Sequence, residues 1–160
     1  MKLSTISESP IAPEPIPKFH GEFAFLSNFY PSPITIDGIV YPTVEHAFQA
    51  AKTNDPLTKQ KIAAKDTPGK AKHAGGKRGI IRDFDQNWET RKVEVMRSLI
   101  QQKFQDTQLR EMLLQTGNRP LIEGNSWNDT FWGVCKEKGE NHLGKILMKV
   151  RSELAALVQR

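Results

Sequence analysis

The sequence predicts an α+β fold: a single, mostly helical domain with one small antiparallel β-hairpin. Three observations lead to this prediction. Capped, amphipathic helical patterns recur from residue 43 almost to the end of the 160-residue chain. Only one hairpin signal is present, and strands do not alternate with helices, which argues against a doubly wound parallel sheet. A chain of this length buries a core without covalent cross-links, and its single cysteine, Cys135, excludes an intramolecular disulfide.

Residues 34–36 and 39–41 are predicted to form the hairpin, which leads into the first helix. Asp37-Gly38 separates the two strands, and this pair supplies the positive φ angles of a type I′ turn. Thr43 is the predicted N-cap of the helix, because its hydroxyl can accept a hydrogen bond from an early helical N–H. The apolar residues that follow have the i, i+3, i+4, i+7 spacing of one buried face: Val44, Ala47, Phe48 and Ala51.

Cap and stop signals place further helices along the rest of the chain. Asp55-Pro56 and Thr67-Pro68 each put proline at a first helical position, and these helices are expected to reach about residue 65 and the Gly75-Gly76 pair. Apolar stripes predict helices over residues 87–104, 106–115 and 143–157, and residues 121–123 are predicted as a short strand.

Residues 1–18 contain four prolines and few large apolar side chains. This composition predicts a disordered proline-rich tail ahead of a domain at residues 19–160. The chain has no apolar run near the ~18 residues of a membrane span, and its N-terminus lacks the apolar centre of a signal peptide. We therefore expect a soluble cytoplasmic protein with no membrane partner. The formal net charge of +5 suits a phosphate-bearing ligand and does not require nucleic acid.

Glu45, Gln49 and Lys52 form a polar row beside the apolar face of the first helix. Two interpretations remain open at this point. The row either lies along the wall of a cleft, where it carries reactive groups, or forms a solvated edge with a weak ion pair.

Three other segments also have both a functional and a structural interpretation. Residues 59–78 hold seven Lys or Arg and one acid, and they either bind a phosphate or form a solvated basic face. Trp88 is either core or a ring that stacks on a heterocycle. Residues 123–133 combine Asn, Asp and Gly with tryptophans, which suits a ligand pocket or a hydrogen-bonded turn. The four histidines show no metal-ligand spacing, so we predict no metal site. No cofactor is expected either.

Taken together, the motifs resemble those of the NADAR family, the YbiA-like N-glycosidases. The resemblance covers about residues 19–155, and it implies the YbiA-like form of the mostly helical α+β fold. The matching motifs occur in the same order as in the family: residues 25–29, 37–38, 41–49 with Lys52, 67–72, 87–88 with Met96, 128–133, 139–144, 147–148 and Arg151.

This resemblance implies a metal-independent N-glycosidase that cleaves the bond between a ribose carbon and a nitrogen. Family members release ribose 5-phosphate from early riboflavin-pathway intermediates or remove ADP-ribose from modified guanine. The expected partner is therefore a phosphorylated ribosyl small molecule or an ADP-ribosylated base, and nucleic acid is expected only as the carrier of such a base. A non-catalytic binding module for ADP-ribose or another NAD derivative is the alternative.

By motif match, the essential glutamate is expected to be Glu45, the loop acid Asp129 and the stacking ring Trp88. Lys52 is expected to hold a phosphate or hydroxyl, or to attack the ribose carbon and form a Schiff base. The other positions expected to bind substrate are Asn28, Phe29, Gln49, Arg82, Asn128, Trp132, Gly133 and Asn141.

One departure from the family pattern concerns a cation. Many members place an arginine three residues before the tryptophan, whereas Asp85 stands there in this chain and Arg82 lies six residues before Trp88. Either Arg82 reaches the ligand through a longer loop, or the phosphate contact passes to another cation. For Glu45, burial is expected to raise the pKa and the first turn of a helix to lower it, and the sequence leaves the balance open.

Overall fold

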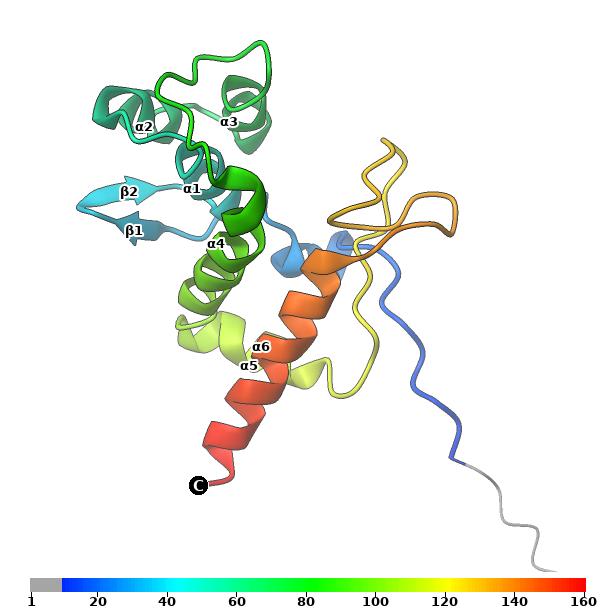
Figure 1. Ribbon diagram of the computed structural model, residues 1–160. Helices are drawn as coiled ribbons and strands as arrows, with labels where there is room; N and C mark the ends of the chain where they lie inside the picture. Colours follow the sequence, from blue (N-terminus) through cyan, green and yellow to red (C-terminus); the bar gives the residue numbers. More distant parts are fainter. Residues whose placement is uncertain (1–9) are drawn as a thin grey trace, which may run out of the picture.

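The computed structural model describes residues 10–160, and residues 1–9 of the predicted tail lie outside the described part of the chain. Figure 1 shows two groups of helices joined by the long α4: α1, α2, α3 and the hairpin form one group, and α5 and α6 form the other. The elements in chain order are η1 (Gly21–Leu26), β1 (Ile34–Ile36), β2 (Ile39–Tyr41), α1 (Val44–Ala50), α2 (Pro56–Ala63), α3 (Pro68–Ala74), α4 (Trp88–Lys103), α5 (Thr107–Gln115) and α6 (His142–Val158).

The predicted hairpin is confirmed. Its two strands are antiparallel, with Ile34 opposite Tyr41 and Ile36 opposite Ile39. Asp37 and Gly38 have φ angles of 50° and 78°, the positive values that a type I′ turn requires at both central residues. The Ile34 and Tyr41 side chains are buried, so the hairpin packs one end of its inner face against the helices.

Side-chain caps begin the helices where the sequence predicts them. The Thr43 hydroxyl accepts a hydrogen bond from the His46 N–H at 3.2 Å. The Asp55 carboxylate accepts one from the Thr58 N–H at 2.9 Å. Thr67 caps α3 and Asp106 caps α5 in the same way. These helix predictions are confirmed, with α2 ending at Ala63, slightly before the expected residue 65.

The prediction of a short strand at residues 121–123 is wrong. Leu121 forms only an isolated parallel bridge with Ile16, whose carbonyl accepts from the Ile122 N–H at 3.0 Å. The pairing stops because the Gly124 N–H bonds back to the Ile122 carbonyl at 2.9 Å and turns the chain. Ile16 is fully buried, so this residue of the predicted tail packs into the core of the domain.

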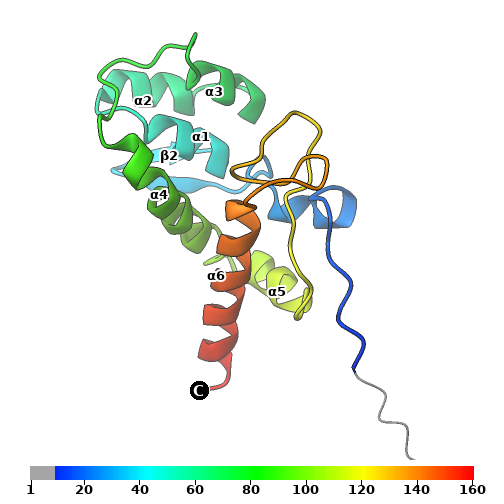
Figure 2. The same cartoon turned by 45° about the vertical axis from the view of Figure 1, so that its right-hand side comes forward.

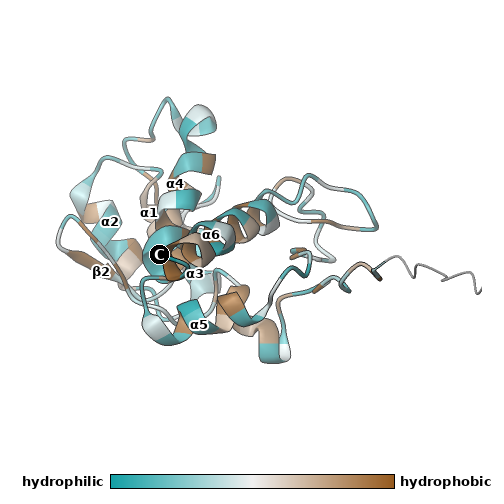
Figure 3. Cartoon of the chain, turned by 90° about the horizontal axis from the view of Figure 1, so that it is seen from below, coloured by the Kyte–Doolittle hydropathy of each residue, from teal (hydrophilic) through white to brown (hydrophobic). Residues whose placement is uncertain are grey.

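The last helix buries the predicted face except at its end. Leu143, Leu147 and Leu154 are at most 9% exposed, whereas Leu157 is 64% exposed. The reason is visible in Figure 1, where the C-terminal end of α6 projects past its neighbours α4 and α5. Figure 3 shows that apolar and polar residues mix around α5 and α6, as expected for helices that cover a core on one side. No helix within residues 10–160 has the length and apolar character of a membrane span.

The helix α1 is packed against α2, α3 and α4, and all seven of its residues are buried. Two of them, Glu45 and Gln49, are polar, and buried polar groups need partners or a cavity. Figures 1 and 2 both show the long loop between α5 and α6 beside η1 and across from α1 and α3. The polar residues of α1 meet this loop at the candidate site.

Candidate active site

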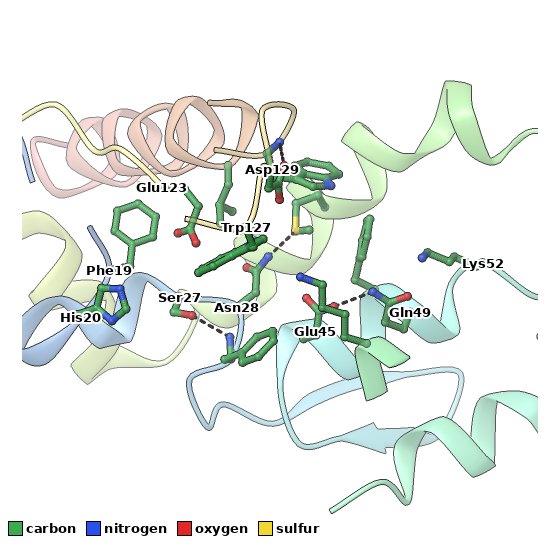
Figure 4. A pocket seen from close by; sticks show the side chains of 16 residues that line it. Phe19, His20, Ser27, Asn28, Glu45, Gln49, Lys52, Glu123, Trp127 and Asp129 are labelled. Atoms are coloured by element: carbon green, nitrogen blue, oxygen red, sulfur yellow. Dashed lines mark hydrogen bonds between the residues drawn. The ribbon is translucent and has the colours of Figure 1, made fainter. Parts of the chain in front are cut away.

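A cavity of about 460 Å³ lies between α1 and the loop that follows α5. Its wall comes from segments far apart in the sequence: residues around η1, α1, α3, α4, the start of α6 and the loop over residues 123–132. Figure 4 shows these side chains converging on one space. Of the positions expected from the sequence, those that line it are Asn28, Phe29, Glu45, Gln49, Lys52, Asp129 and Trp132.

The predicted polar row faces this cavity, although α1 ends at Ala50 and Lys52 lies in the turn that follows it. Glu45 and Gln49 are only 7% and 5% exposed, which excludes the solvated edge as an interpretation. The Gln49 amide donates a hydrogen bond to Glu45 Oε1 at 2.6 Å. The Lys52 ammonium lies further along, where it donates to the Gly75 carbonyl at 3.1 Å. The row therefore forms one wall of the cavity, with Glu45 and Lys52 at different positions along it.

Burial raises the pKa of the Glu45 carboxyl above its ordinary value. The hydrogen bond from Gln49 and the charges of Lys72 and Lys52 oppose this effect, while the nearby Asp129 adds to it. The competition that the sequence left open is therefore decided by desolvation, which penalises the charged form of a buried carboxyl. A carboxyl of this kind holds its proton to a higher pH than an exposed one and is suited to acid catalysis.

Asp129 is held in the loop by backbone hydrogen bonds. Its Oδ1 accepts from the N–H groups of Trp132 at 2.9 Å and Phe131 at 3.2 Å. The Asn125 side chain closes the same turn, accepting from the Asp129 N–H at 3.1 Å and donating to its carbonyl at 2.8 Å. These hydrogen bonds within the loop hold Asp129 in place at the wall of the cavity.

Gly133 and Asn141 lie outside the cavity lining and shape it indirectly. A Cβ on Gly133 would overlap the carbonyl oxygen of Glu123, so only glycine permits this approach of the two backbones. Asn141 accepts from the Glu123 N–H at 3.0 Å and donates to the Leu121 carbonyl at 2.9 Å. Both residues therefore hold the segment that carries Glu123.

Trp88 also lies outside the lining. It is 4% exposed, and its ring packs behind Phe48 with the centroids 5.0 Å apart. Phe48 separates it from the cavity and contacts the Trp132 ring edge-on at 5.4 Å. The tryptophan rings that line the cavity are those of Trp127 and Trp132.

Arg82 and Asn128, two further expected binding residues, are exposed and do not line the cavity. The Arg82 carbonyl accepts a hydrogen bond from the Thr53 hydroxyl. Asp85, at the position where the family commonly has arginine, is buried, pairs with Arg91 and donates its N–H to the Lys52 carbonyl at 2.8 Å. The cations that reach the cavity are instead Lys52 and Lys72.

Among the lining residues that sequence reasoning did not assign to the site, four are polar, charged or tryptophan side chains of the cavity wall that bear on its chemistry: His20, Lys72, Glu123 and Trp127. A signal existed for three of them. Lys72 belongs to the basic stretch, and Glu123 and Trp127 belong to the aromatic and polar loop for which a ligand pocket was one interpretation. His20 carried no signal, because only the tertiary structure brings its segment to the cavity.

Three buried side-chain oxygens at the cavity accept no hydrogen bond within the described residues: Asn28 Oδ1, Gln49 Oε1 and Glu123 Oε2. Unpaired buried acceptors cost free energy, so each of these three side chains is stabilised by any rearrangement that supplies an N–H or O–H donor. Among residues 10–160, no group of three or more His, Cys, Asp or Glu side chains is placed to hold a metal ion.

Comparisons with known proteins agree with this architecture. Residues 18–155 match the NADAR domain. N-glycosidase YbiA of Escherichia coli is 39% identical over 138 residues, which cover 85% of this chain and 82% of that protein. A riboflavin biosynthesis protein of Vibrio vulnificus is 39% identical over 94% of this chain, which spans only 40% of that longer protein. The NMR structure of E. coli YbiA superposes with a TM-score of 0.79 at 34% identity, covering 94% of this chain and 90% of that one. The chain belongs to the NADAR family.

Proposed function

We propose that this protein is an N-glycosidase that hydrolyses a ribosyl C–N bond. Its substrate is a ribosylaminopyrimidine 5′-phosphate of the riboflavin pathway or an ADP-ribosylated guanine. The names of the relatives, N-glycosidase and riboflavin biosynthesis protein, support this class of reaction. The observation that carries the proposal is the buried Glu45 carboxyl, which has a raised pKa and faces a cavity that also holds cations and aromatic rings.

Glu45 acts as the acid of the reaction. It donates its proton to the leaving nitrogen as the ribosyl C–N bond breaks, and the bonding electrons leave with that nitrogen. The positive charge that develops on the ribose is stabilised by the Glu45 carboxylate so formed and by Asp129. Water then adds to the ribose carbon and returns a proton to Glu45, which completes the hydrolysis.

Lys52 and Lys72 bind the phosphate of the substrate. Both ammonium groups reach the cavity, and a phosphate is the natural partner for two converging cations. This assignment replaces the arginine that many family members place before the tryptophan. Arg82 is exposed outside the cavity, so Lys52, in the turn after α1, and Lys72 of α3 are the better candidates.

A second route gives Lys52 a covalent role. Burial lowers the pKa of its ammonium, which increases the fraction of the neutral, nucleophilic amine. In that route the ribose ring opens, the amine attacks the ribose carbon, the base leaves with a proton from Glu45, and water hydrolyses the resulting Schiff base. Borohydride would reduce this Schiff base to a stable adduct detectable by mass spectrometry. Absence of an adduct from wild type under turnover would leave Lys52 with phosphate binding alone.

Product release by wild type and Glu45→Gln tests the proposed function. The two substrates are a ribosylaminopyrimidine 5′-phosphate and an ADP-ribosylated guanine nucleotide, assayed in parallel. We expect wild type to release ribose 5-phosphate or ADP-ribose and the variant to be slower by roughly 10²-fold or more. Tight binding of ADP-ribose without release from either substrate would instead identify a non-catalytic binding module.

A further inference from the structure

Glu123 is a carboxyl of the cavity to which the proposed mechanism assigns no role. Its backbone is fixed on both sides: the N–H donates to Asn141 Oδ1 at 3.0 Å, and the carbonyl accepts from the Val134 N–H at 2.9 Å. Its Oε2 is buried and accepts no hydrogen bond within the described residues. The backbone of Glu123 is therefore held in place, and its side chain lines the cavity with one buried acceptor unpaired within the described residues.

Figure 4 locates Glu123 at one end of the cavity. Glu123 lies beside Phe19 and His20, the Trp127 ring lies between Glu123 and Glu45, and Lys52 lies at the opposite end. A flat heterocycle fits the end with aromatic rings, because rings stack on bases. The phosphate of the same substrate fits the end with the Lys52 cation. This arrangement puts the base against Glu123 and the scissile bond near Glu45.

Glu123 is close to its protonation midpoint at neutral pH, chiefly because it is buried. Burial and the nearby carboxylates of Asp129 and Glu45 raise its pKa, Lys72 lowers it, and the result is about 7. His20 and Lys52 line the same cavity. A ligand that donates N–H groups to Glu123 would favour the carboxylate and release the proton that the free protein holds.

We propose that Glu123 binds the leaving base of the substrate by accepting hydrogen bonds from N–H groups on its ring edge. The class of base is an amino-substituted pyrimidine or a guanine, whose edges carry such donors. A base with carbonyl oxygens at the same positions would face the buried acceptor with another acceptor and bind poorly. The proposal rests on the proposed function for the direction in which the substrate lies.

Binding of free bases tests this inference without any turnover. The probes are diaminopyrimidinone, which carries amino and ring N–H donors, and 1,3-dimethyluracil, which has a similar size and carbonyl oxygens but no N–H donor. Calorimetry on the full chain compares wild type with Glu123→Gln and with Glu123→Asp, which keeps the carboxylate. Glu140→Gln is the matched control, because Glu140 is exposed and bonded to His142.

We expect wild type to bind diaminopyrimidinone at least about tenfold more tightly than 1,3-dimethyluracil, since a hydrogen bond to a charged group contributes roughly 1.5–3 kcal/mol. Glu123→Gln should lose most of this preference, Glu123→Asp should keep part of it, and Glu140→Gln should keep all of it. Near pH 7, binding to wild type should release a proton, measured from the buffer dependence of the enthalpy, and binding to Glu123→Gln should not.

Equal affinity of wild type for the two bases, or no measurable affinity for diaminopyrimidinone, would overturn the proposal. So would a full preference retained by Glu123→Gln. Binding of ribose 5-phosphate to each variant checks that the cavity is intact, because its expected contacts are the lysines. Base binding is measured without turnover, so it does not depend on the outcome of the product-release assay with Glu45→Gln. The two proposals can therefore be refuted independently of each other.

Discussion

Lys103 gives a prediction whose magnitude follows directly from the structure. This lysine of α4 is 1% exposed, and its ammonium donates a hydrogen bond to the Ser27 carbonyl at 2.8 Å. The rings of Tyr30 and Phe104 lie 5.6 and 5.4 Å from it. Burial without a carboxylate partner lowers the pKa of Lys103 from 10.5 to about 7.

The lowered pKa makes the stability of the protein depend on pH. Between pH 7 and 10.5 the unfolded chain binds this proton and the folded chain does not, so stability increases as pH rises through that window. At ~1.4 kcal/mol per pH unit, the full effect is on the order of 5 kcal/mol. Lys103→Met removes the titrating group and should remove this gain.

Urea unfolding followed by tryptophan fluorescence at pH 7, 8, 9 and 10 measures the effect. The difference in unfolding free energy between wild type and Lys103→Met should change by roughly 4 kcal/mol over this range, in favour of wild type at high pH. Lys145→Met, at an exposed position of α6, should run parallel to wild type and controls for other titrating groups. Parallel curves for wild type and Lys103→Met would refute the argument that the amine is buried and deprotonated.

Three further predictions concern the cavity. Burial raises the pKa of Glu45, and its protonated form is the proposed acid. A pH–rate profile should therefore show kcat falling as pH rises through that pKa, and Glu45→Gln should not show this fall. Trp88→Ala should lower the unfolding free energy, measured by calorimetry, by about 3–5 kcal/mol. Trp127 is 54% exposed, so Trp127→Ala should leave the unfolding free energy nearly unchanged and raise KM. A large loss of stability in Trp127→Ala together with a stable Trp88→Ala would contradict the placement of the two rings. Gly133→Ala should lower thermal stability and activity together, because its Cβ overlaps the Glu123 carbonyl; a stable, fully active variant would show that this contact is not required.

Local signals in the sequence were sufficient for most of the secondary structure. The Asp37-Gly38 turn and the Thr43 cap are formed by interactions within a few residues, so their side chains carry the information directly. The expected strand at residues 121–123 failed for the complementary reason. Its pairing depends on Ile16, more than a hundred residues earlier, and on a backbone turn at Gly124 that periodicity does not report.

The candidate site was likewise predicted in part from local spacing and decided in part by tertiary packing. Spacing put Glu45, Gln49 and Lys52 on one stripe of a helix, but it did not distinguish a cavity wall from a solvated edge. Burial against the loop after α5 made that distinction, and it also decided the direction of the pKa shift of Glu45. Trp88 is a residue that the motif match assigned to stacking and that the fold places behind Phe48, outside the cavity lining.

The sequence by itself determined the fold class, the helix starts, the hairpin and membership of the NADAR family, because these depend on short-range chemistry and on motifs preserved in order. The tertiary structure alone decided which side chains share the cavity. It brought in Lys72, Glu123 and His20, left Arg82 outside, and buried Ile16 of the proline-rich segment. The physical reason is that burial and electrostatic coupling depend on distances between segments remote in the chain, and periodicity along the chain carries no record of those distances.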